Sequence, residues 1–486
     1  MIIGVDVGTT MTKAAVFDRD GHAVAEADEP TTLHRFDGAR VEQDLDEVLA
    51  TVSSVVRKVA AAQAEPVTAV ALTGQGDGLW LRDEQGRPTR PAVSWLDGRA
   101  GPLVRRWYEN GTMARVHRLT GQGMFPGAHG PLLAALDAEE PEVLERSAVA
   151  GYCVDAMVQH LTGEITVDAS DASLPFLDVG SRTYSADALA ECGVSRWRAL
   201  LPEPAEPDRL FRLDGRGARL LDLPEGTPVT GGPFDLPACL LGSGLSEVGD
   251  GLLTVGTTLA CQVVADRVPA EPSGEPAGMW LCTDRPDRFS RAMPAMVGTA
   301  GLDWLLELLG IGIGDVERLL EASPPGARGV SALPFLAESG ERAPFVDPRA
   351  RGQLTGVNLG TDRADIVRAV CESIAYAARH CLEAAGLTGR LAVCGGGSRS
   401  RGWMQVFADV LGREVILPSD DAIGVRGATA AAWRALGEEA DGARWLARGA
   451  RVEPRADLRG RYEEGYARYR GQLDSARALW SSDAPA

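Results

Sequence analysis

Two stretches of the chain repeat one pattern. Residues 2–18 read IIGVDVGTTMTKAAVFD, and residues 251–266 read GLLTVGTTLACQVVAD. Each stretch has an apolar run, then V-G-T-T, then a second apolar run, with Gly8 and Gly256 in equivalent places. Apolar, β-branched runs on both sides of a small-residue turn indicate two strands joined tightly. Because one copy opens each half of the chain, the repeat predicts a duplicated domain.

The length of the chain supports the same interpretation. A chain of 486 residues exceeds one ordinary core and favours two domains. We place the boundary in the glycine-rich stretch 241–251, which gives an N-terminal domain over 1–245 and a C-terminal domain over 246–486. Short β-branched runs alternate with amphipathic stretches, such as a helix expected over 45–59 with Asp44 as its N-cap. This alternation is typical of the α/β class.

Composition limits the classes of binding partner and the cellular compartment that we expect for this protein. The net charge of −19 argues against a nucleic-acid partner, whose phosphates call for a basic surface. The chain lacks an apolar run of 18 residues, so we expect no membrane partner, and its first residues do not resemble a signal peptide. The eight cysteines are scattered without a C-x-x-C pair, which favours reduced thiols over a disulfide framework or a zinc site. We therefore expect a cytoplasmic protein.

The first V-G-T-T turn carries groups that a polyphosphate needs. Thr9 and Thr10 supply hydroxyl and amide donors, and Lys13 supplies a cation. Asp6 can hold Mg²⁺ directly or through water. A plain β-hairpin with a glycine turn is the alternative for this loop taken alone.

Two later glycine-rich sites extend the phosphate hypothesis. Gly256 and Thr257 repeat the first turn, and two such loops can hold a polyphosphate from opposite sides. Gly395 and Gly396 lie between an apolar strand and a helix expected to begin near Ser400. Such a junction can present helix N–H groups to an anion or let a flat base lie on the backbone. A simple tight turn is the alternative, because neither a Walker loop nor G-x-G-x-x-G is present.

Acidic and aromatic residues in three further loops are candidates for the chemistry. Asp235, in GGPFD, stands where a helix is expected to begin, so it is either an N-cap or a general base that accepts the proton of a substrate hydroxyl. Gly76 and Asp77, in TGQGDG, end one strand, and Trp95 ends the next apolar stretch. A carboxylate beside an aromatic wall is a common way to hold a polyol, although Asp/Gly turns without a ligand would look the same.

Taken in order, these motifs resemble the FGGY family of carbohydrate kinases. The resemblance covers D-x-G-T-T-x-x-K, TGQGDG, PAVSWLDGR, GGPFD, VGTT, LPFLAESGERAPFVDPRARG, CGGGSRSRGWMQVFADVLG and GVRGATAAA. It implies two duplicated ribonuclease-H-like (actin-like ATPase) domains with a catalytic cleft between them. It also implies transfer of phosphate from ATP, with Mg²⁺, to a small sugar or polyol. A homodimer is left open.

The resemblance further implies roles for individual residues. Asp235 is similar to the catalytic base, and Asp6 to the metal-linked carboxylate. The residues implied along the phosphates and the adenosine are Thr9, Thr10, Lys13, Gly256, Thr257, Thr299, Asp303, Gly395, Gly396 and Ser400. The stretch implied to contact the substrate contains Gly76, Asp77 and Trp95.

The substrate loop bears on which sugar is used. Xylulokinases usually show Met-His where this chain has Gly76-Asp77, whereas Q-G-D-G followed by a tryptophan is similar to erythritol kinases. Glycine at position 76 predicts a roomier pocket. The rest of the chain resembles pentulose kinases at least as well, so a ketopentose such as xylulose ranks slightly ahead of a tetritol. An actin-like ATPase without a sugar substrate is the alternative of another class.

Overall fold

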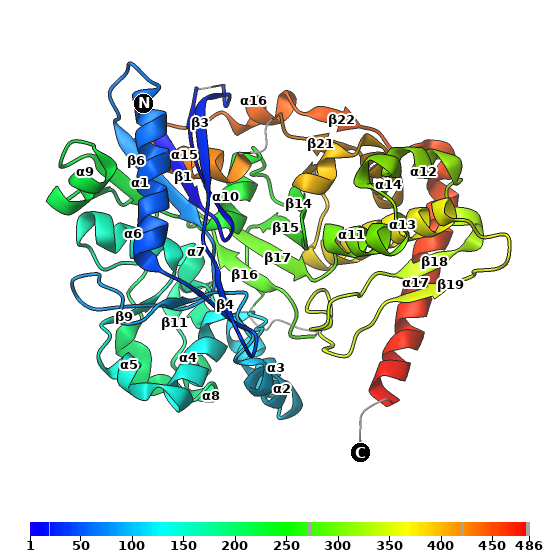
Figure 1. Cartoon of the computed structure of the whole chain (residues 1–486), viewed down its shortest axis with the longest axis horizontal. Helices are drawn as coiled ribbons and strands as arrows, with labels where there is room; N and C mark the ends of the chain where they lie inside the picture. Colours follow the sequence, from blue (N-terminus) through cyan, green and yellow to red (C-terminus); the bar gives the residue numbers. More distant parts are fainter. Residues whose placement is uncertain (19, 270–274, 420–421, 483–486) are drawn as a thin grey trace. The chain divides into compact units, whose positions relative to one another are not determined.

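The computed structural model describes residues 1–18, 20–269, 275–419 and 422–482 (Figure 1). Its internal contacts divide the chain into two units. The first unit consists of Met1–Ser246, Val264–Ser290 and Ala422–Ala447; the second consists of Glu247–Val263, Arg291–Asp421 and Arg448–Ala486. The single boundary between residues 245 and 246 stays a prediction. It assigned all residues after 245 to the second domain, whereas the segments Val264–Ser290 and Ala422–Ala447 belong to the first unit.

A six-stranded sheet forms the centre of the first unit, in the order β12-β13-β6-β1-β2-β3. Its strands are β12 (Phe211–Arg212), β13 (Pro228–Gly231), β6 (Ala69–Gly74), β1 (Ile2–Val7), β2 (Met11–Phe17) and β3 (Ala23–Pro30). β1 runs antiparallel to β2, with Asp6 opposite Lys13, and parallel to β6, with Asp6 opposite Thr73. β13 also runs parallel to β6. Three neighbouring strands therefore end at the same edge of the sheet.

Alternate residues of β1 pack against two helical layers, as the period of a strand requires. Ile3, Val5 and Val7 lie in a core that α1 (Leu45–Ala61) and α6 (Cys153–Thr162) cover. Ile2 lies in another core, with α15 (Ile423–Ala435). Asp44 caps α1 by accepting hydrogen bonds from two backbone amides, as expected. Burial on both faces explains why β1 and β6 are almost continuously apolar.

The second sheet has the same topology, in the order β16-β17-β15-β14-β20-β21-β22. Its strands are β16 (Met279–Cys282), β17 (Phe289–Ala295), β15 (Leu259–Ala265), β14 (Gly251–Val255), β20 (Leu391–Cys394), β21 (Val415–Leu417) and β22 (Ala450–Val452). β14 pairs antiparallel with β15 and parallel with β20, and β20 pairs parallel with β21. The predicted duplication is thereby confirmed: β14-β15-β20 repeats β1-β2-β6.

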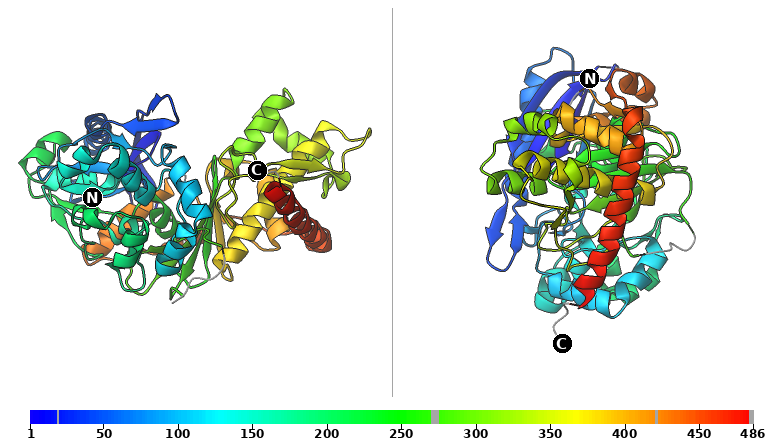
Figure 2. Two further views of the ribbon diagram at one scale, coloured as in Figure 1. Left: turned by 90° about the horizontal axis from the view of Figure 1, so that it is seen from below. Right: turned by 90° about the vertical axis from the view of Figure 1, so that its right-hand side faces the viewer.

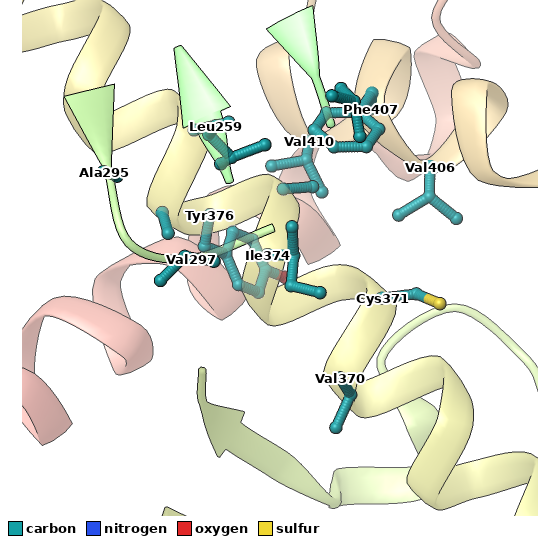
Figure 3. Packing of buried hydrophobic residues seen from close by; sticks show 14 of the residues in the cluster. Leu259, Ala295, Val297, Val370, Cys371, Ile374, Tyr376, Val406, Phe407 and Val410 are labelled. Carbon is teal, nitrogen blue, oxygen red and sulfur yellow. The ribbon is translucent and has the colours of Figure 1, made fainter. Parts of the chain in front are cut away.

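Helices cover the sheet of the second unit, and their apolar faces form its core. These helices are α11 (Thr299–Leu308), α12 (Val316–Ala322), α13 (Arg363–Ala385), α14 (Arg401–Leu411) and α17 (Arg459–Ser482). Figure 3 shows Ile374 of α13, Phe407 of α14 and Leu259 of β15 among the side chains of this core. α17 packs against α13 and α14, and Figure 2 shows it as the long C-terminal helix.

Smaller elements complete the fold. The short strands are β4 (His34–Phe36), β5 (Arg40–Gln43), β7 (Trp80–Arg82), β8 (Ala92–Val93), β9 (Val149–Gly151), β10 (Leu177–Asp178), β11 (Thr183–Tyr184), β18 (Ser331–Leu333) and β19 (Gln353–Thr355). The remaining α-helices are α2 (Gly101–Glu109), α3 (Thr112–Thr120), α4 (His129–Glu139), α5 (Pro141–Glu145), α7 (Ala169–Ala172), α8 (Ala186–Glu191), α9 (Gly215–Leu221), α10 (Asp235–Gly242) and α16 (Gly442–Ala447). Among the described residues, no helix is both long and apolar enough to span a bilayer. All eight cysteines lie among the described residues, and none of them forms a disulfide.

Two glycines allow α10 and α15 to touch backbone to backbone. A Cβ added at Gly242 would lie 1.8 Å from the Ile423 carbonyl oxygen. A Cβ added at Gly427 would lie 1.8 Å from the Ala238 carbonyl oxygen. Real atoms cannot approach so closely, so a side chain at either position must push the helices apart.

We expect Gly427→Ala to destabilise the protein by about 1–3 kcal/mol, the usual cost of overpacking, despite the better helix propensity of alanine. Gly471→Ala is the matched control, because Gly471 lies inside α17 with nothing within 4 Å of an added Cβ. That substitution should stabilise by about 0.5–1 kcal/mol. Urea unfolding midpoints measure both changes. Shifts of the same sign in the two variants would contradict the packing argument.

Candidate active site

Most of the predicted catalytic and substrate residues follow three neighbouring parallel strands. Asp6 ends β1, Gly76 and Asp77 follow β6, and Asp235 follows β13. Ligands of α/β folds commonly bind at the carboxyl ends of such strands. The topology thus brings together residues far apart in the sequence.

Asp6 has a carboxylate with an unused acceptor. Among the described residues, its Oδ1 atom is buried without a hydrogen-bond partner. Burial raises the pKa of Asp6 to about 6, and the nearby charge of Lys13 opposes this shift. In the part of the chain that the structure describes, no group of three or more His, Cys, Asp or Glu side chains could hold a metal ion by itself. This arrangement fits Mg²⁺, which often takes one or two carboxylates and completes its shell with water and substrate phosphates.

Thr9 links the phosphate turn to the proposed substrate wall. The Trp95 indole Nε1 donates a hydrogen bond to Thr9 Oγ1 at 2.7 Å. Thr9 Oγ1 in turn donates to Gln75 Oε1 at 3.2 Å, and Gln75 Nε2 donates to Gln43 Oε1 at 2.9 Å. The sequence motifs assigned Thr9 to the phosphate-binding residues and Trp95 to the substrate-binding residues, whereas the structure brings the two side chains into contact. Thr10 is exposed next to Thr9.

Asp77 adopts an uncommon backbone conformation, with φ of 55°. Its side chain is 9% exposed, and its Oδ1 atom accepts a hydrogen bond from the backbone amide of His129 at 3.3 Å. The His129 ring Nδ1 donates to the Gly78 carbonyl oxygen at 3.1 Å. Burial lowers the pKa of His129 to about 4, so the ring is neutral. His129, which no motif singled out, helps to hold the Asp77 loop.

The expectation of a roomier pocket at position 76 is wrong. A Cβ added at Gly76 would lie 2.5 Å from the Phe234 ring, because that ring covers the glycine. The space that a side chain at position 76 would fill is therefore taken by the aromatic ring before Asp235.

Asp235 is the first residue of α10, and the N-cap position belongs to Phe234. The alternative that Asp235 serves as the N-cap therefore does not apply. Burial raises its pKa to about 8, the charges of Asp6 and Asp77 add to the shift, and a hydrogen bond from the Leu236 amide opposes it. Its loop is held in place, because the Phe234 amide donates to Ser170 Oγ at 3.0 Å.

Asp171 is a buried carboxyl that the motifs did not reveal. It lies on α7 with an exposed fraction of 0%. Among the described residues, neither of its oxygens has a hydrogen-bond partner. Burial raises its pKa well above the ordinary value, and the charges that add to this shift are those of Asp155, Asp168, Asp235 and Asp77. Asp171 is one of two acidic residues in the short polar stretch VDASDAS, which carries no local signal that could have indicated this position.

In the second unit, the repeated V-G-T-T turn contacts the start of α11. The Thr299 amide donates to the Gly256 carbonyl oxygen at 2.8 Å. The Ala300 amide donates to the Thr257 carbonyl oxygen at 3.3 Å. Asp303 lies one turn further along α11 and is exposed. The structure thus brings Gly256, Thr257 and Thr299 together.

The three consecutive glycines of the second unit have different surroundings. Gly395 has φ of 92°, and a Cβ added there would lie 2.7 Å from the Val255 carbonyl oxygen. At Gly396 nothing lies within 4 Å of an added Cβ. Gly396 therefore offers open backbone on which a flat base could lie. Ser400 caps α14 by accepting from the Trp403 amide at 3.1 Å, and its hydroxyl donates to Glu317 at 2.7 Å.

Comparisons with known proteins match both halves of the chain. Residues 1–242 match the N-terminal domain, and residues 280–436 the C-terminal domain, of the FGGY family of carbohydrate kinases. An erythritol kinase of Brucella abortus is 30% identical over 510 residues, covering 99% of this chain and 97% of the relative. A xylulose kinase of Streptomyces rubiginosus is 31% identical over 443 residues, covering 89% and 87%.

A solved structure shows the same fold. The xylulose kinase of Rhodospirillum rubrum has a TM-score of 0.88 and 27% identity, covering 99% of both chains. This similarity confirms the two-domain α/β fold that the motifs implied. None of the relatives named here favours the actin-like ATPase without a sugar substrate.

The raised pKa of Asp235 predicts a pH-dependent stability. The folded, ligand-free protein keeps this proton up to about pH 8, while an unfolded chain releases it at about pH 3.9. Between these values the folded state binds more protons, so the wild type loses stability as the pH rises. Asp235→Asn avoids this loss. Its melting temperature should match the wild type at pH 4 and exceed it by at least about 1 °C at pH 9, the shift for about 1 kcal/mol in a chain of this length.

Differential scanning calorimetry without ligands measures this difference. Asp474→Asn, at an exposed position of α17, is the control and should show no such trend. A constant difference between wild type and Asp235→Asn across the pH range would contradict the burial of the Asp235 carboxyl.

Proposed function

The chain belongs to the FGGY family of carbohydrate kinases, and from this membership we propose that it transfers the γ-phosphate of ATP to a hydroxyl of a small neutral polyol, with a tetritol as the first candidate. The observation that carries the proposal is the group of carboxyls in the first unit. The charge of Asp77 acts on both Asp171 and Asp235, so the three lie near one another.

A group of carboxyls selects for a ligand rich in hydrogen-bond donors. An ionised carboxylate only accepts hydrogen bonds and a protonated carboxyl both donates and accepts, and an alditol offers on every carbon a hydroxyl that can serve either. The carbonyl of a ketose offers no donor, and an anionic sugar acid would be repelled by the charges. Trp95 adds an apolar wall against which the C–H groups of a polyol can pack.

The chemistry requires a base beside the substrate hydroxyl. Asp235 would take the hydroxyl proton as that oxygen bonds to the γ-phosphorus, while the bond from phosphorus to the β,γ-bridging oxygen breaks and ADP leaves. A carboxyl whose pKa is about 8 in the free protein is close to the operating pH, as general-base catalysis favours. Asp6 would hold Mg²⁺, which when bound neutralises charge on the phosphates. Lys13 would add a cation at the first phosphate turn.

The nucleotide groups of the second unit are assigned by the same reasoning. Gly256, Thr257 and Thr299 meet at the start of α11, where the Thr299 and Ala300 amides bind the Gly256 and Thr257 carbonyl oxygens. We assign these residues to the phosphates because their turn repeats the first V-G-T-T turn. Gly396 would support the adenosine, because its surface is open. We further expect the enzyme to act in the cytoplasm, where free thiols stay reduced.

A ketopentose is the second candidate substrate. The similarity to xylulose kinases over most of the chain favours it. Mass spectrometry of the products from a mixture of ketoses, aldoses and alditols distinguishes the two candidates directly.

We expect Asp235→Asn to lower kcat by about 10²–10⁴-fold, the usual effect of losing a general base. Binding of a non-hydrolysable ATP analogue should be nearly unchanged, because Asp235 lies outside the phosphate turns. Steady-state kinetics and calorimetric titration measure the two quantities. A variant that keeps more than about a tenth of the wild-type kcat would remove Asp235 from the role of base.

Asp77→Asn tests the choice of substrate. Asparagine tolerates a positive φ and keeps an acceptor for the His129 amide, so the loop should retain its shape. Loss of a charged hydrogen bond costs about 1.5–3 kcal/mol, so kcat/KM for erythritol should fall at least about tenfold. Xylulose and ribulose should lose less. An unchanged kcat/KM for all three would place Asp77 outside the substrate site.

A further inference from the structure

A chain of hydrogen bonds joins four residues of the first unit. It runs from the Trp95 indole to the Thr9 hydroxyl, then to the Gln75 side chain and finally to Gln43, over distances of 2.7, 3.2 and 2.9 Å. These residues come from different places: the β1–β2 turn, the end of β6, strand β5 and the segment after β8. No family motif assigns a role to either glutamine.

The chemistry of the donors gives this chain one direction. An indole N–H can only donate, so the Thr9 oxygen must accept from Trp95. The Thr9 proton then needs an acceptor, which Gln75 Oε1 provides. The Gln75 amide is thereby oriented with its NH₂ group toward Gln43 Oε1. Each bond therefore fixes the orientation of the next group.

Burial makes the chain energetically significant. Gln43 is 0% exposed and Gln75 is 2% exposed. Burying amide groups costs free energy unless their hydrogen bonds are made, and an apolar pair of similar size would avoid that cost. The Gln75 backbone amide also donates to the Val7 carbonyl oxygen at 3.1 Å, which ties it to the end of β1. Two buried glutamines at this place therefore call for a reason beyond packing.

We propose that Gln43 and Gln75 are positioning residues. Gln43 orients the Gln75 amide, Gln75 fixes the Thr9 hydroxyl, and this hydroxyl holds the Trp95 indole in the orientation that binds the substrate. The proposal rests on the proposed function, because it takes Trp95 as the substrate wall. Under this proposal Thr9 contributes to the binding of both substrates. Its hydroxyl orients the Trp95 indole, and the V-G-T-T turn to which it belongs holds the phosphates of ATP.

Three substitutions test the chain. Thr9→Val keeps the shape of the side chain and removes the hydroxyl, whereas Thr9→Ser keeps the hydroxyl. Gln43→Met removes the terminal acceptor. Loss of one such hydrogen bond should raise KM for the best substrate among erythritol, xylulose and ribulose by about three- to tenfold. We expect this rise in Thr9→Val and Gln43→Met, and a smaller rise in Thr9→Ser, which keeps the hydroxyl. KM for ATP should change less than KM for the polyol in Gln43→Met.

A double-mutant cycle with Trp95→Phe separates positioning from general stability. Phenylalanine has no N–H to orient, so Gln43→Met should have almost no further effect on KM in that background. Gln472→Met is the control: the Gln472 amide donates to Ser331 and Thr355 in the second unit, and its loss should leave KM for the polyol unchanged.

Hydrogen exchange of the ¹⁵N-labelled Trp95 indole, identified by its loss in Trp95→Phe, gives a readout that needs no turnover. It should be faster in Thr9→Val and Gln43→Met than in wild type, Thr9→Ser or Gln472→Met. Full additivity in the cycle, or unchanged exchange in both Thr9→Val and Gln43→Met, would overturn the positioning role. If Trp95→Phe alone leaves KM unchanged, the assignment of Trp95 as the substrate wall fails instead.

Discussion

Parallel pairing of β13, β6 and β1 is the constraint on which the candidate site depends. Parallel strands end at the same edge of a sheet, so the loops after them meet even though about 70 and 160 residues separate them. Asp6 lies near the end of β1, and Asp77 and Asp235 follow β6 and β13. The second sheet repeats the arrangement with β14 and β20, whose ends carry Gly256 and Gly395. Duplication of one hairpin thus supports both of the proposed ligand-binding regions.

The site carries electrostatic strain that the rest of the fold must support. Burial raises the pKa values of Asp6, Asp171 and Asp235, and the charges of neighbouring carboxylates add to the shift at Asp171 and Asp235. Asp77 adds an uncommon φ of 55°. Hydrogen-bond donors of a polyol and the charge of a metal ion would relieve the repulsion, so the features that destabilise the free protein are those that favour ligand binding. Extensive apolar cores on both faces of β1 supply the compensating stability.

Hydrogen bonding also connects the residues proposed to bind phosphate with those proposed to bind the substrate. Thr9 belongs to the phosphate turn by sequence, yet its hydroxyl is engaged by Trp95 and Gln75. A movement of the Trp95 indole would therefore displace the Thr9 hydroxyl, and a movement of the turn would displace the indole. Gly76 likewise affects a second residue. Because Gly76 has no side chain, the Phe234 ring can pack against it, and this packing helps to place Asp235, which follows Phe234.

The sequence by itself determined the duplicated hairpins, the α/β class, the helix over α1 with its Asp44 cap, and the glycine and aspartate motifs. Each of these depends on short-range periodicity or turn chemistry, which a few consecutive residues express. The tertiary structure alone decided that Phe234 covers Gly76, that Thr9 meets Trp95, and that Asp171 is buried near Asp77 and Asp235. It also decided that segment Ala422–Ala447 returns to the first unit. These contacts join residues far apart in the chain, and their partners are selected by strand pairing and packing, which no local pattern records.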